Sequence, residues 1–168
     1  PLARAHLVFK AGAESLDADA AGSLALLERL VLRGLRGAGA DGYGPLDWEG
    51  YATAESVGFS VTVPAPALGA ALASLAAVVK SPPLDAASIE EEKEGAIAAI
   101  RSEASDPDSV YEAALNRRLF AKYPWRRDPA GSEKALRAAT AESLAGIAAA
   151  WLAPGDAPLV VAGSIDGD

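Results

Sequence analysis

Apolar and polar residues alternate in two parts of the chain, a pattern typical of β-strands with one buried face. The first is RAHLVFKAG, residues 4–12. The second is WEGYATAESVGFSVTVP, residues 48–64, which predicts two strands joined by a turn near Glu55 to Gly58 and ended by Pro64. A third segment, APLVVAGSID at residues 157–166, is an apolar run that predicts a buried closing strand.

Helical spacing dominates most of the remaining chain. In residues 15–37, Asp17 and Asp19 mark the expected start of a buried helix, whose apolar positions are Leu24, Leu27, Leu30, Val31 and Leu35. A second helix over residues 67–83 is stopped by a Pro-Pro pair, and a long third helix ends near Asp106 and Pro107. Further helices are expected at about 109–121 and 141–152. The segment GAGADGYGP, residues 37–45, lacks the Lys-Ser/Thr of a phosphate loop and predicts a flexible loop.

The order of these elements is strand, helix, strand, strand, several helices and strand. This order indicates an α+β fold rather than alternating βαβ units. A chain of 168 residues that is 51% hydrophobic can bury one sizeable core, so residues 1–168 are expected to form a single domain. Because the sequence begins inside a predicted strand and without an initiator Met, we expect it to be part of a longer chain.

Composition excludes several classes of function. The net charge of -8 argues against nucleic-acid binding, and the absence of Cys excludes disulfides, thiol nucleophiles and thiolate metal sites. No apolar run reaches the roughly 18 to 20 residues that span a bilayer, so a soluble chain is expected, and its compartment, cytoplasm or cell envelope, stays open. One local basic cluster interrupts the acidic chain, and we interpret it as a solvated surface: Arg117, Arg118, Lys122, Arg126 and Arg127.

Few residues have the spacing of a catalytic site. His6 is the single histidine, so the predicted role of this strand residue is structural, and a hydrolase triad with Ser102, Ser105 or Ser109 has no other base. A run of carboxylates predicts a solvated helix face rather than an acid/base pair: Glu90, Glu91, Glu92 and Glu94.

Three segments together resemble the zinc peptidases of the insulinase and mitochondrial processing peptidase type, the M16 or pitrilysin family. In GSLALLERLVLRG, residues 22–34, Gly22, Glu28, Leu30 and Gly34 match the family's Gly-x-Ala-His-x-x-Glu-His helix. The segment IEEEKEGAIAAIRSEASDPDS matches the helix with the family's third ligand, and residues 122–166 resemble its Tyr-Pro segment, Leu-rich helix and closing strand. The resemblance covers nearly the whole chain and implies a two-layer domain, with an antiparallel or mixed sheet packed against several helices.

The zinc ligands of that family are missing here. Two histidines four residues apart converge on one metal ion from one helix face, and the Glu before the second histidine activates the bound water. The matching positions are Ala25, Glu28 and Arg29, the third ligand position is Ala99, and the acidic position Glu92 is retained. Alanine has no lone pair and arginine is a permanent cation, so we expect no zinc, no other cofactor and no catalytic residue. Glu28 is expected to pair with Arg29 or to lie at a solvated edge.

The resemblance implies an accessory role, because some members of this family pair a zinc-bearing partner with a silent one around a closed chamber. The leading hypothesis is a catalytically inactive subunit that encloses a peptide substrate beside a zinc-bearing M16 peptidase or beside further domains of its own chain. Two alternatives stay open. One is an active zinc metallopeptidase whose metal site lies in another domain or subunit, and the other is a purely structural subunit.

Overall fold

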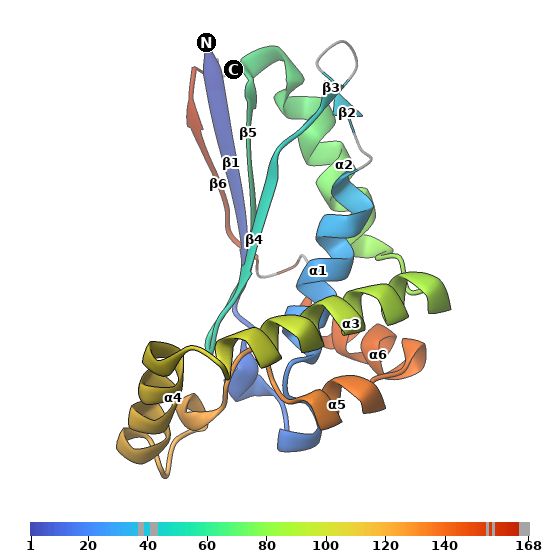
Figure 1. Cartoon of the computed structure of the whole chain (residues 1–168). Helices are drawn as coiled ribbons and strands as arrows, with labels where there is room; N and C mark the ends of the chain where they lie inside the picture. Colours follow the sequence, from blue (N-terminus) through green and yellow to red (C-terminus); the bar gives the residue numbers. More distant parts are fainter. Residues whose placement is uncertain (37–38, 41–43, 154, 156, 165–168) are drawn as a thin grey trace.

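Helices cover one side of a four-stranded antiparallel sheet in the computed structural model, which describes residues 1–36, 39–40, 44–153, 155 and 157–164 (Figure 1). The strand order is β4-β5-β1-β6. The strands are β1 (Leu2–Phe9), β4 (Trp48–Ala52), β5 (Val57–Pro64) and β6 (Leu159–Gly163). The sheet and its helices confirm the expected α+β class.

Most of the helices lie close to their predicted positions. They are α1 (Ser23–Arg36), α2 (Leu68–Lys80), α3 (Ala86–Glu103), α4 (Pro107–Leu119), α5 (Glu133–Ala138) and α6 (Ala141–Trp151). The side chains of Asp85, Asp106, Ser132 and Thr140 each accept a hydrogen bond from a backbone N–H in the first turn of α3, α4, α5 and α6. The short α5 was not predicted, because its six residues carry no full apolar period.

The core lies between α1 and the sheet. Leu26, Leu27 and Leu30 of α1 are fully buried, and alternate residues of β1, such as Ala5 and Phe9, face the same layer. Phe9 packs edge-to-face against Phe59 of β5, with 6.4 Å between the ring centroids. Truncation of one such leucine to alanine costs about 2–5 kcal/mol, so α1 is the helix on which the layer packing depends most.

The first helix begins later than the two aspartates suggested. Residues Ala13–Ser15 and Ala18–Ala20 form short 3-10 turns, and α1 starts only at Ser23. Gly22 has a φ of +89°, and a Cβ there would lie 2.5 Å from the carbonyl oxygen of Ala130. The left-handed backbone at Gly22 and its close packing thus fix where the helix begins.

The closing strand is not buried, which corrects the sequence interpretation. β6 pairs with β1 alone at an edge of the sheet, and Leu159 and Val160 are 47% and 60% exposed. An apolar run does not distinguish a central strand from an edge strand. In the Gly-rich segment, β2 (Gly39–Ala40) pairs with β3 (Gly44–Pro45), and the rest of the expected loop lies outside the described residues. Among the helices that the structure describes, none is long and apolar enough to cross a membrane.

Candidate functional site

The helix pair predicted from the zinc-peptidase resemblance is α1 with α3, and ion pairs join the two helices. Arg29 Nε donates a 3.1 Å hydrogen bond to Glu92 Oε2. Arg33, one turn later on α1, lies 3.5 Å from the other oxygen of Glu92 and 2.8 Å from Glu91 Oε2. The Glu92 side chain is only 6% exposed, so its carboxylate sits almost completely inside a contact with two guanidinium groups. Figure 1 shows α3 crossing α1.

Glu28 faces the sheet rather than α3. It is 9% exposed, and a Cβ on Gly50 of β4 would overlap its Oε1 atom, so only a glycine leaves room for this carboxyl group. Burial raises the pKa of Glu28 to about 7, although the charges of Arg29 and Arg36 oppose the rise. No hydrogen bond or ion pair joins Glu28 to another described residue.

The three positions that would ligate zinc do not fit the metal. Ala25 is half-buried and Ala99 is exposed, and neither side chain can donate a lone pair. The Arg29 guanidinium places a permanent charge beside Glu92, where a dication would be repelled. Within the described ranges, no cluster of three or more His, Asp or Glu side chains could hold a metal ion. The resemblance also implies that Ala25 and Ala99 face each other between two packed helices, and this stays a prediction.

Two expectations about charged residues are wrong. Arg29 pairs with Glu92 and not with Glu28, because Glu28 points to β4 while Arg29 reaches across to α3. Glu92 is buried, whereas Glu90, Glu91 and Glu94 are exposed as expected and pair with Lys93, Arg33 and Arg137. Consecutive residues point in different directions around a helix, so adjacent glutamates do not all share one face, and here Glu92 is the one that faces inward.

The side chains of three further candidates, His6, Ser105 and Ser109, contact neighbouring groups of the fold. His6 on β1 lies with its Nε2 atom 3.3 Å from the Tyr51 hydroxyl, and the two rings pack edge-to-face. Ser105 donates to the carbonyl of Arg101, and Ser109 donates to Asp106 at the start of α4. These contacts are two hydrogen bonds at helix ends and one ring contact that joins β1 to β4 across the intervening β5.

Sequence reasoning missed Arg33 and Gly50. The spacing of Arg29 and Arg33, one helical turn apart, could have indicated a basic stripe complementary to Glu91 and Glu92. Gly50 has no such signal, since its role depends on the approach of α1 to β4, which no local pattern encodes.

Comparisons with known structures place the fold. An M16-like peptidase from Alicyclobacillus acidocaldarius matches with a TM-score of 0.80 and 21% identity, over 98% of this chain and 41% of that one. An M16 peptidase inactive domain from Pseudomonas fluorescens matches with a TM-score of 0.80 and 23% identity, over 99% and 42%. A protease from Helicobacter pylori has a TM-score of 0.85 at 13% identity, over 99% and 42%.

The chain therefore has the fold of M16-like peptidases, as the sequence resemblance predicted. It spans less than half the length of these solved structures. No family model matches the sequence, and no curated protein matches it either.

The buried Glu28 should make stability depend on pH. Its pKa is about 7 in the folded chain against an ordinary value of 4.5, so the unfolded chain releases this proton first and stability falls as the pH rises through that interval. The difference corresponds to at most about 3 kcal/mol. The side chain of Glu28→Gln stays neutral at every pH. Urea unfolding should therefore show the variant becoming more stable relative to the parent between about pH 4 and about pH 8.

Glu55, an exposed carboxyl in the turn between β4 and β5, supplies the control for that measurement. Glu55→Gln should leave the pH dependence of the parent unchanged. A constant difference between Glu28→Gln and the parent across this pH range would contradict the assignment of Glu28 as a buried acid.

Removal of the Glu92 carboxylate should loosen α1 from α3. Glu92→Ala leaves Arg29 and Arg33 without their shared partner at a largely buried contact, and we expect a loss of about 2 kcal/mol in the free energy of unfolding. The matched control is Glu91→Ala, whose side chain is 68% exposed and whose loss should cost much less than the loss of Glu92. Equal effects of the two variants in urea unfolding would show that Glu92 is not the central partner.

Proposed function

We propose that this chain is a catalytically silent domain with the M16-like fold, and that it serves as the accessory half of a peptidase. In this role it encloses a peptide substrate beside a zinc-bearing M16-like subunit or beside further domains of a longer chain. The observation that carries the proposal is the hydrogen bond from Arg29 on α1 to the buried carboxylate of Glu92 on α3. The guanidinium of Arg29 thus occupies the position at which M16 zinc peptidases have a zinc-ligating imidazole.

Two physical arguments support the absence of zinc binding and peptidase activity. Ala25 and Ala99 supply no ligand atoms, and a tetrahedral zinc site needs three protein ligands besides its water. Glu28 keeps the position of the general base, but its pKa of about 7 follows from burial against β4, and without a bound metal it has no activated water to deprotonate.

The solved structures support the accessory part of the proposal. One of them, from Pseudomonas fluorescens, is itself described as an M16 inactive domain, and this chain spans 42% of it. Domains with this fold therefore occur within longer chains, consistent with a chamber that one such domain cannot enclose alone.

Zinc content and reconstitution test the proposal. The purified chain should hold less than a tenth of an equivalent of zinc by mass spectrometry and should not cleave an unfolded peptide. When mixed with an M16-like subunit that has an intact His-x-x-Glu-His helix and comes from the same source, it should co-purify with that subunit and raise its peptide turnover.

Two other results would favour the alternatives. One equivalent of zinc, removed by a chelator together with peptidase activity, would indicate an active enzyme. A stable complex with unchanged turnover and unchanged peptide affinity would indicate a purely structural subunit.

Restoration of the ligands should return metal binding but little catalysis. Ala25→His, Arg29→His and Ala99→Glu together place two imidazoles one turn apart and a carboxylate on the neighbouring helix, with Glu28 already in place. Zinc ligands also need surrounding hydrogen bonds that orient them, which these three substitutions do not supply, so weak zinc binding by isothermal titration and almost no turnover are expected. The control is the double variant without Ala99→Glu, which should bind more weakly. A triple variant that stays folded by circular dichroism and binds zinc no better than the parent would refute the assigned positions.

A further inference from the structure

Helix α4 projects from the body of the molecule at the end of α3, and none of its described side chains is buried (Figure 1). Tyr111, Leu115 and Leu119 recur every four residues and therefore form a stripe along one face of the helix. They are 68%, 42% and 63% exposed. A contiguous stripe of large apolar side chains on a helix that contributes nothing to the core is typical of an interaction surface.

An aromatic cluster follows directly after α4. Trp125 packs edge-to-face on Phe120, with 5.7 Å between centroids, and stacks on Tyr123 at 6.2 Å. Tyr123 and Trp125 are still 60% and 44% exposed. The aromatic rings therefore extend the apolar surface beyond the end of the helix.

The same segment concentrates positive charge. Arg117, Arg118, Lys122 and Arg126 are exposed, and residues 113–127 contain no Asp or Glu although the chain has a net charge of -8. Arg127 is half-buried and donates to the carbonyl of Leu16, so this residue anchors the segment to the body of the fold. No ion pair neutralises the four exposed cations within the part of the chain that the structure describes.

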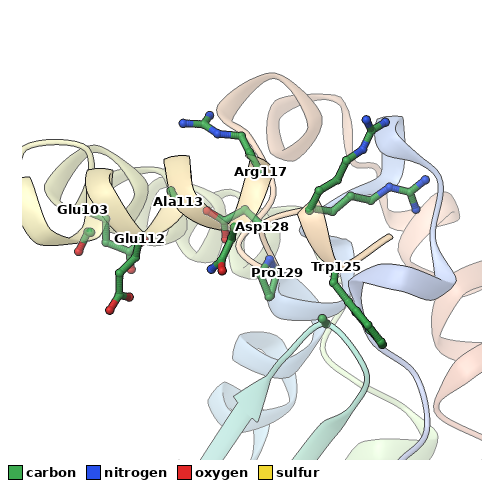
Figure 2. Close-up of a pocket in the computed structure, with 12 residues that line it drawn as sticks. Glu103, Glu112, Ala113, Arg117, Trp125, Asp128 and Pro129 are labelled. Atoms are coloured by element: carbon green, nitrogen blue, oxygen red, sulfur yellow. The ribbon is translucent and has the colours of Figure 1, made fainter. Parts of the chain in front are cut away.

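A groove of about 610 Å³ lies between α4 and residues 125–129. Figure 2 shows Arg117 on one side of this groove and Trp125 on the other, and Glu103 and Glu112 along its far part. Cations and an aromatic ring lie toward one end of the groove and Glu103 and Glu112 toward the other, with Asp128 between them. This distribution of charge favours one orientation of a charged ligand in the groove.

We propose that α4 together with residues 120–129, the α4 surface, binds an acidic segment of a partner protein that also carries apolar side chains. The local excess of cations complements an acidic segment, and the stripe on α4 with the rings beside it accommodates its apolar residues. A nucleic acid fits less well, since a long polyanion would extend past the patch onto a chain whose remaining surface is strongly acidic. The proposal is independent of whether the chain is catalytically silent.

A fluorescent peptide of about ten residues, with Asp and Glu alternating with Leu and Phe, is the probe, because it is long enough to follow the length of α4, about 20 Å. Fluorescence anisotropy at low salt should show saturable binding to the intact chain. Arg117→Glu with Arg118→Glu should weaken the binding about tenfold, since two attractive charges become repulsive.

The matched control is Lys10→Glu with Lys134→Glu, which makes the same change in net charge at two exposed lysines outside the α4 surface. This control should stay within about twofold of the parent. Tyr111→Ser with Leu115→Ser tests the apolar stripe without touching the core and should weaken binding about fivefold. Circular dichroism verifies that each variant is folded.

Four results would overturn the proposal. The first is no saturable binding of the probe, and the second is an equal loss of binding in the lysine control. The third is equal affinity for a peptide with the same acidic residues but Ser in place of Leu and Phe. The fourth is tighter binding of a single-stranded oligonucleotide than of the acidic peptide, because it would assign the surface to nucleic acid.

Discussion

The buried carboxylate of Glu92 is the constraint on which the arrangement of α1 and α3 depends. A carboxylate that is 6% exposed is stable only where cations and hydrogen-bond donors compensate its lost hydration, and Arg29 and Arg33 supply both from successive turns of α1. The pairing fixes how α1 and α3 lie against each other. The same two arginines place positive charge on this face of α1. They therefore both join the helices and repel a metal ion.

Glu28 is also buried, but among the described residues no partner compensates for the hydration that its carboxyl group loses. Its carboxyl is buried against the glycine of an edge strand and has no described hydrogen-bond partner, so it costs stability whenever it is charged. A residue that weakens the fold near neutral pH indicates a constraint other than packing. Under the proposed function, Glu28 is retained because α1 corresponds to the zinc-binding helix of M16 peptidases, in which this position carries the general base.

The chain separates its charges in space. Two concentrations of cations stand out in this acidic chain, one at the contact between α1 and α3 and one on the α4 surface, whereas cations such as Arg4, Lys10 and Lys134 lie singly elsewhere. At the first place they are neutralised by α3, and at the second they lie beside exposed aromatic rings. The two groups of arginines therefore have different roles, since one is internal to the fold and the other is available to a partner.

The sequence by itself determined the order of elements, the main helices and most strand positions, because hydrophobic period, proline stops and polar caps are local properties of the chain. It also determined the absence of ligand atoms at Ala25 and Ala99, since chemistry at a position follows from residue type alone. Tertiary structure decided which glutamate turns inward, that Glu28 meets Gly50 rather than Arg29, and that β6 is an exposed edge. These outcomes depend on contacts between segments far apart in sequence, and a local pattern holds no information about which distant surface a side chain will meet.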